Sequence, residues 1–175
     1  MVSRYWLLLS YLRLLRINEV LALRREDVVL PGDNRMGVDQ LRILIRLKVT
    51  KTGKHQWVAV QERFVAQWLS NLVQHFAPAV KLFPFTAPSA RSIFRDAVAN
   101  VGLPSGYVPH SLRHGGATAL HLSGVSMEDI LLRGRWSSVK AARTYIQMGK
   151  GLLIDAKIDP TVLLRASELR RALPQ

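Results

Sequence analysis

The sequence predicts a mixed α+β fold that is mainly helical, with a small three-stranded antiparallel sheet in its N-terminal third. Residues 41–48 alternate apolar side chains with mostly basic ones, the pattern of a strand with one buried face. Gly53 follows in a short polar turn, and residues 56–60 return as the partner strand of a hairpin. Beyond residue 62, apolar side chains recur every three or four positions, which is typical of amphipathic helices.

The other elements follow from the same periodicities and from residues that cap helices. Asn18, Ser89 and Ser137 are expected N-caps, because their side-chain oxygens can accept free backbone N–H groups, and Ser126 begins a capping-box pattern. Without a repeat or a clear linker, residues 1–175 are expected to form a single domain, with residues 152–175 as a C-terminal extension. We expect a further strand at 27–30 and helices over 3–14, 20–25, 62–76, 90–101, 111–122, 126–134, 137 to beyond 145, and 160–173.

The composition narrows the classes of partner. Twenty-five Lys and Arg residues against twelve Asp and Glu give a net charge of +13, and this excess is spread along the chain. Such a charge favours binding to a polyanion, although charge alone leaves DNA, RNA and anionic membrane open. The absence of cysteine excludes disulfides, cysteine-bound zinc and thiol nucleophiles, and fits an intracellular protein. The apolar run of residues 5–12 is too short to span a bilayer and precedes no signal-peptide cleavage site.

One stretch carries the chemistry. His110-Ser-Leu-Arg113-His114 is followed by Trp136 and, nine residues later (145 − 136 = 9), by Tyr145. A phenol is a poor nucleophile at neutral pH because its pKa is about 10. A basic stretch that supplies His, Arg and Tyr therefore favours attack on a phosphodiester whose negative charge is held by arginines.

These residues resemble the tyrosine recombinases, the phage-integrase family of site-specific DNA recombinases. The resemblance covers about residues 5–148. It implies the catalytic-domain fold of that family, double-stranded DNA as partner, DNA recombination or integration in a mobile element, and no metal, ATP or other cofactor. The matching motifs, in the family's order, are Arg16-Ile-Asn-Glu19, the basic hairpin Thr50-Lys51-Thr-Gly-Lys54, His110 to His114, Gly134-Arg-Trp136, and Tyr145.

The resemblance also implies a role for each of these residues. Tyr145 would attack the DNA phosphodiester and form a 3′-phosphotyrosyl intermediate. Arg16 and Arg113 would hold the phosphate oxygens, since a guanidinium matches them bidentately. The other implied roles are proton donation to the 5′-oxygen by Lys51, proton transfer by His110, an indole hydrogen bond or packing by Trp136, and support of the site by Glu19.

Several of these assignments have alternatives. Lys48 and Lys54 compete with Lys51 as the proton donor, and Trp136 can be an ordinary core residue. His110 and His114 have metal-ligand spacing, but the chain has no HExxH motif and no obvious third ligand, so we expect no metal and a structural role for His114. A second basic set is either a solvated face or a DNA-phosphate contact: Lys54, Arg133, Arg135, Lys140 and Arg143.

Two departures from the family bear on function. The chain begins almost at the catalytic domain, so we expect the N-terminal, core-binding half of the DNA clamp to be absent. Leu15 stands before Arg16 where relatives commonly carry glycine, which would alter the turn that aims Arg16. Residues 152–175 either dock on a neighbouring subunit or pack on their own domain.

The family implies a monomer that assembles into a tetramer on DNA, in the nucleus or the bacterial cytoplasm according to host. Two other functions remain open: a catalytically idle DNA-binding remnant of a mobile element, and a monomeric enzyme similar to type IB topoisomerases. The motif His110-Ser-Leu-Arg113-His114, which begins with a histidine, favours the recombinase.

Overall fold

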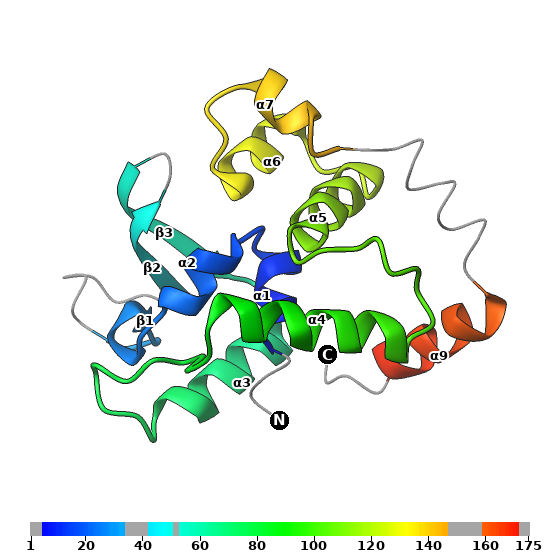
Figure 1. Ribbon diagram of the computed structural model, residues 1–175. Helices are drawn as coiled ribbons and strands as arrows, with labels where there is room; N and C mark the ends of the chain where they lie inside the picture. Colours follow the sequence, from blue (N-terminus) through cyan, green and yellow to red (C-terminus); the bar gives the residue numbers. More distant parts are fainter. Residues whose placement is uncertain (1–4, 34–41, 51–52, 147–158, 172–175) are drawn as a thin grey trace.

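The fold is mainly helical with a small antiparallel sheet, as predicted (Figure 1). The computed structural model describes residues 5–33, 42–50, 53–146 and 159–171. No helix in these ranges is long and apolar enough to cross a membrane. The elements in chain order are α1 (Tyr5–Leu12), α2 (Ile17–Ala22), the 3-10 helix η2 (Arg25–Asp27), β1 (Val28–Val29), β2 (Ile43–Thr50), β3 (Gly53–Val60), α3 (Arg63–Val73), α4 (Ala87–Asn100), α5 (His110–Leu122), α6 (Met127–Gly134), α7 (Val139–Arg143) and α9 (Pro160–Arg171).

The sheet has the order β1-β2-β3, and both pairs are antiparallel. Ile45, in the central strand, pairs with Val28 on one side and Val58 on the other, and all three are buried. Thr50 pairs with Gly53, which confirms the predicted hairpin. Lys51 and Thr52, at its turn, lie outside the described residues.

The basic face of β2 is held by acids from η2. Arg46 lies 3.3 Å and Lys48 3.4 Å from a carboxylate oxygen of the buried Asp27, and Lys48 also pairs with Glu26. Lys48 is therefore held at the sheet by two carboxylates.

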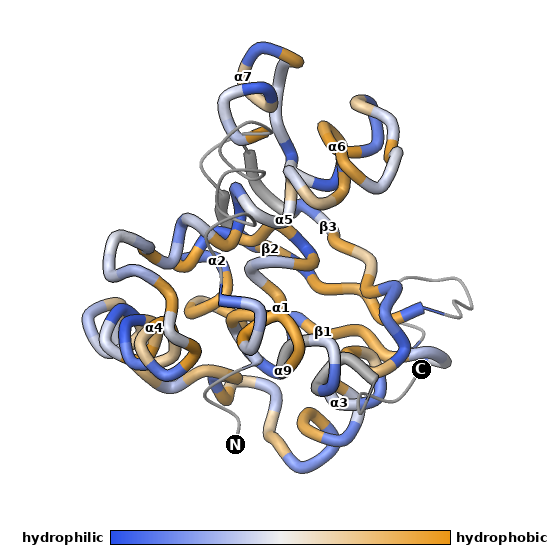
Figure 2. The backbone as a smooth tube through the Cα atoms, turned by 90° about the vertical axis from the view of Figure 1, so that its right-hand side faces the viewer, coloured by the Kyte–Doolittle hydropathy of each residue, from blue (hydrophilic) through white to orange (hydrophobic). Residues whose placement is uncertain are grey.

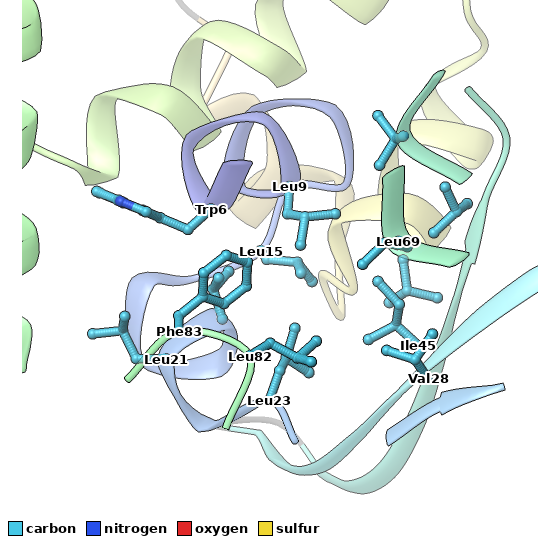
Figure 3. Packing of buried hydrophobic residues seen from close by; sticks show 14 of the residues in the cluster. Trp6, Leu9, Leu15, Leu21, Leu23, Val28, Ile45, Leu69, Leu82 and Phe83 are labelled. Carbon is cyan, nitrogen blue, oxygen red and sulfur yellow. The ribbon is translucent and has the colours of Figure 1, made fainter. Parts of the chain in front are cut away.

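The main core lies between α1, the sheet, α3 and α4. Trp6, Leu9 and Leu15 from the N-terminal segment pack against Ile45 of the sheet and Leu69 of α3 (Figure 3). Figure 2 shows hydrophobic stretches of backbone around α1 and the sheet. Burial of this apolar surface is the main favourable contribution to folding.

A second, smaller core joins α5 and α6 to the turn after α1 and to the segment that follows α7. Its buried members are Leu14, Ala117 and Ile130, and Trp136 and Tyr145 pack at its edge. Figure 1 shows α5 between the main body and the α6–α7 pair. Two residues with predicted chemistry, Trp136 and Tyr145, therefore lie at this second core.

Some predicted helix starts were wrong by one to three residues. Thr86, rather than Ser89, caps α4, because its hydroxyl accepts a hydrogen bond from the Ser89 N–H at 3.3 Å. Ser138, rather than Ser137, caps α7 and accepts from the Ala141 N–H. Runs with several small hydroxyl residues leave the choice of cap to tertiary packing. Ser126 caps α6 as predicted.

The C-terminal helix α9 lies beside the end of α4 (Figure 1). A Cβ atom built on Gly102, just after α4, would lie 3.8 Å from a methyl group of Val162. In this structure α9 therefore contacts its own chain.

Candidate active site

The site begins at the turn between α1 and α2. Leu14 has a φ of 53°, in the left-handed region that side chains other than glycine rarely adopt. The neighbouring Leu15, where relatives are expected to carry glycine, does not have a positive φ and is a main-core residue. Leu14 is held in this conformation by complete burial of its side chain in the second core. The turn directs the Leu14 carbonyl oxygen towards two arginines described below.

Arg16 immediately precedes α2 and is paired with Glu19. The Arg16 Nη1 atom lies 2.7 Å from Glu19 Oε1, and the Arg16 backbone N–H donates to Glu19 Oε2, also at 2.7 Å. The Glu19 carboxylate therefore satisfies the first free N–H of the helix. The predicted cap Asn18 instead lies exposed inside the first turn, because α2 begins at Ile17.

Close packing of α5 on α1 brings Arg113 to this turn. A Cβ atom at Gly116 would overlap the backbone carbonyl of Tyr11, so only glycine permits this approach. Three residues earlier on α5, the buried Arg113 guanidinium donates to the carbonyl oxygens of Leu14 and Gly134. Burial, together with the charges of Arg135 and Arg16, lowers the pKa of Arg113 to about 10. Arg113 thus remains protonated at neutral pH.

Tyr145 lies among the rings of three other predicted site residues. Its ring centre is 4.5 Å from that of His114, 4.8 Å from Trp136 and 5.4 Å from His110. The prediction that Tyr145 lies in the last turns of a helix was wrong, because α7 ends at Arg143. Tyr145 follows in a turn closed by its N–H donating to the Ala142 carbonyl at 2.9 Å.

Two rings cover the Arg113 guanidinium. Its central carbon lies 4.5 Å from the Trp136 ring centre and 5.4 Å from that of Tyr145. Trp136 can pack so closely because Gly134 lacks a side chain; a Cβ there would overlap the indole. The buried Trp136 Nε1 atom has no hydrogen-bond partner in the described part of the chain. Trp136 therefore packs on Arg113 and still has an N–H that can donate a hydrogen bond, so both predicted roles are compatible.

His110 stands in the first turn of α5, with its ring 5.1 Å from that of His114. Desolvation of the His110 ring lowers its pKa, and the positive charges of His114, Arg113 and Arg16 lower it further. His110 is thus neutral at pH 7, and one of its ring nitrogens is available to accept a proton.

The residues of the second basic set have different environments in the structure. Lys140 and Arg143 are exposed on α7, and Arg133 donates to Gln61 at 3.2 Å. The Arg135 side chain is instead only 6% exposed and pairs with Glu19 at 2.6 Å. Lys51 and the Lys54 side chain lie outside the described residues. Over the described ranges, no group of three or more His, Asp or Glu side chains could hold a metal ion.

Comparison with known proteins identifies the family. The family model described as "Phage integrase family" matches residues 1–150. The chain belongs to the phage integrase family. A search of curated proteins finds no match.

Solved structures of recombinases share the fold of this phage integrase family member. The XerA recombinase crystal structure has a TM-score of 0.61 at 20% identity, covering 99% of this chain and 58% of that one. XerH site-specific recombinase bound to difH substrate gives 0.64 at 18% identity, with 94% and 45% coverage. The Tn1549 transposon integrase in complex with transposon right end DNA gives 0.60 at 19% identity, with 83% and 54% coverage. The chain thus spans about half the length of these proteins.

Proposed function

We propose that this chain cleaves and rejoins double-stranded DNA as a site-specific recombinase, through a covalent link between Tyr145 and a 3′-phosphate. The observation that carries the proposal is the placement of the Tyr145 ring against His110, His114 and Trp136, with the Arg113 guanidinium beside it. Membership of the phage integrase family and the DNA complexes of XerH and the Tn1549 integrase support it.

In the proposed reaction the Tyr145 oxygen forms a bond to phosphorus while the bond from phosphorus to the 5′-oxygen breaks. Arg16 and Arg113 stabilise the charge on the non-bridging oxygens, which raises the rate because it acts on the transition state. Lys51 supplies the proton that the departing 5′-oxygen needs. His110 can accept the proton that the Tyr145 hydroxyl loses, and its lowered pKa supports this role because the ring is neutral at pH 7. Rejoining reverses these steps with a 5′-hydroxyl as nucleophile.

Binding of a phosphate to Arg113 requires the site to rearrange. Only 1% of Arg113 is exposed, beneath the rings of Trp136 and Tyr145. We propose that the turn carrying Tyr145 shifts when DNA binds, uncovering the guanidinium and placing the phenol beside the phosphate. The indole N–H of Trp136 then has an acceptor.

The partner and assembly follow from the same proposal. The net charge of +13 and the exposed Lys140 and Arg143 on α7 support contact with DNA phosphates. We propose that residues 1–175 act as a single catalytic domain that is monomeric when free and tetrameric on DNA, where residues 152–175 dock on a neighbouring subunit instead of on their own chain. Sedimentation with and without DNA tests this assembly.

A suicide substrate tests the chemistry. DNA nicked next to the cleavage site loses its short 5′-hydroxyl fragment, so the covalent complex accumulates and migrates slowly on a denaturing gel. We expect trapping by the native chain and none by Tyr145→Phe, which keeps the ring contacts but lacks the nucleophile. DNA binding without trapping would contradict catalysis and leave a DNA-binding remnant. Plasmid relaxation by the monomer without recombined product would instead indicate topoisomerase activity.

A further inference from the structure

Arg135 has a conformation and an environment unlike those of a DNA-contacting surface cation. Its φ of 55° lies in the left-handed region, and only 6% of its side chain is exposed. An arginine in this region is strained, so the surrounding contacts must hold it there. Those contacts are its hydrogen bonds to Glu19, Leu14 and Arg133.

The Arg135 guanidinium connects the two arginines of the proposed phosphate site. Its Nη2 atom lies 2.6 Å from Glu19 Oε2, and the other oxygen of that carboxylate holds Arg16. The same Nη2 atom lies 3.4 Å from the Leu14 carbonyl oxygen, which also accepts from Arg113. Arg135 thus contacts both the Glu19 carboxylate, which holds Arg16, and the Leu14 carbonyl oxygen, which accepts from Arg113.

Arg135 also sets the charge around the site. Arg16, Arg113 and Arg135 carry three positive charges against the single negative charge of Glu19. With Arg135 in place, the Glu19 carboxylate is shared between two guanidinium groups. Without it, Glu19 is free to pair more completely with Arg16, which would draw Arg16 away from a phosphate and remove one positive charge.

We propose that Arg135 is a positioning residue that holds Arg16 and Arg113 for phosphate binding through Glu19 and the Leu14 carbonyl. It does not contact DNA itself. This inference rests on the proposed function, and it departs from the DNA-phosphate contact expected from the sequence. A lysine cannot replace it fully, because the two acceptors are met by a planar guanidinium with several fixed donors.

The test uses Arg135→Gly and Arg135→Lys, with Lys140→Ala as the matched loss of one exposed cation. Glycine accepts the left-handed backbone, so Arg135→Gly removes the guanidinium without adding strain. DNA affinity is measured as a function of salt, and covalent trapping is measured in a single turnover at saturating DNA. We expect Arg135→Gly to trap about 100-fold more slowly, because the reacting groups are misplaced, with a much smaller loss of DNA affinity, because only the contacts at one phosphate are disturbed. Arg135→Lys should recover part of the trapping rate. Lys140→Ala should weaken DNA affinity and lower its salt dependence more than it changes the trapping rate at saturating DNA.

Two results would overturn the proposal. If Arg135→Gly weakens DNA binding and lowers the salt slope by about one while the saturated rate stays native, Arg135 is a phosphate contact. If neither quantity changes, Arg135 has no role in the site. Combining Arg135→Gly with Glu19→Gln gives a further check: the double variant should be little slower than the slower single variant, because both act through one carboxylate.

A readout that does not depend on cleavage separates this inference from the proposed function. The side-chain N–H signals of Arg16 and Arg113 in NMR spectra report where the two guanidinium groups lie. They should shift in Arg135→Gly and stay in place in Lys140→Ala. Unchanged Arg16 and Arg113 signals in Arg135→Gly overturn the positioning role even if the native chain traps no DNA, whereas absent trapping with shifted signals contradicts only the proposed chemistry.

Discussion

The central guanidinium carbon of Arg113 lies 4.5 Å from the centre of the Trp136 ring, so the arginine is sheltered by an aromatic face rather than by a carboxylate. An aromatic face stabilises the cation without neutralising it, whereas a carboxylate would cancel its charge. The arrangement therefore keeps Arg113 charged and ready to attract an anion.

Shortening Trp136 should show how much its ring contributes to stability by packing. Trp136→Ala should lower the free energy of unfolding by about 2–3 kcal/mol, because the rings over Arg113 lose contacts. Trp136→Phe should cost about 1 kcal/mol, because the smaller ring leaves a gap while the N–H that it removes makes no hydrogen bond in the described part of the chain. Urea unfolding gives both values. Equal losses for the two variants would show that the ring itself contributes little to stability.

A methyl group at Gly134 should disturb the site more than one elsewhere. A Cβ at Gly134 would overlap the Trp136 ring, so Gly134→Ala should lower the free energy of unfolding by about 1–3 kcal/mol. At Gly106 no atom lies within 4 Å of such a Cβ, and Gly106→Ala should stay within about 0.5 kcal/mol of the native chain. Thermal unfolding compares the two. A harmless Gly134→Ala would mean that Trp136 moves freely.

The left-handed conformation of Leu14 can be tested by comparing glycine with alanine. Both substitutions empty the same buried site and should destabilise the chain by about 2–5 kcal/mol. Leu14→Gly should nevertheless be more stable than Leu14→Ala by about 1 kcal/mol, because only glycine adopts a positive φ without strain.

Leu15 provides the control, because it is equally buried but does not have a positive φ. There the order should reverse, with Leu15→Ala more stable than Leu15→Gly. Chemical unfolding of the four variants gives the comparison. The same order at both positions would contradict the assignment of the strained residue to Leu14.

His110 should make stability depend on pH in a defined direction. Its pKa in the folded chain is lowered by desolvation and by neighbouring positive charges, so the unfolded chain binds a proton more readily. Stability from this group is therefore complete above its unfolded pKa of about 6.5 and is lost as the pH falls below that value. His110→Gln should flatten this part of the profile. Urea midpoints between pH 5 and 8 measure it, and an unchanged slope in His110→Gln would assign the dependence to another group.

The residues of the candidate site that could be predicted from sequence are those with distinctive chemistry. Arg16, His110, Arg113, Trp136 and Tyr145 are predicted because their order and spacing resemble those of the tyrosine recombinases. The sheet and most helices followed from hydrophobic periodicity, because burial on one face leaves a regular pattern. The helix containing Tyr145 was predicted too long, because ring packing on the second core ends α7 at Arg143.

The contacts that place those residues could not be predicted in the same way. Nothing in the sequence distinguishes Arg135 from the exposed Arg143, since their difference lies in which one meets Glu19 in space. Gly116 gave a partial signal, because adjacent glycines inside a helix suggest close approach of another backbone. The strain at Leu14 had no local signal, because leucine is among the residues least expected at a positive φ.

The close contact between Gly116 and the Tyr11 carbonyl makes one part of the site more rigid than the other. Helices that meet backbone to backbone have almost no freedom to slide, so α1 and α5 move as one body, carrying the Leu14 carbonyl and Arg113 with them. Tyr145 instead follows a five-residue helix and is held largely by ring contacts. The groups that would bind the phosphate therefore form a rigid unit. Tyr145, the proposed nucleophile, is the part of the site whose position can change.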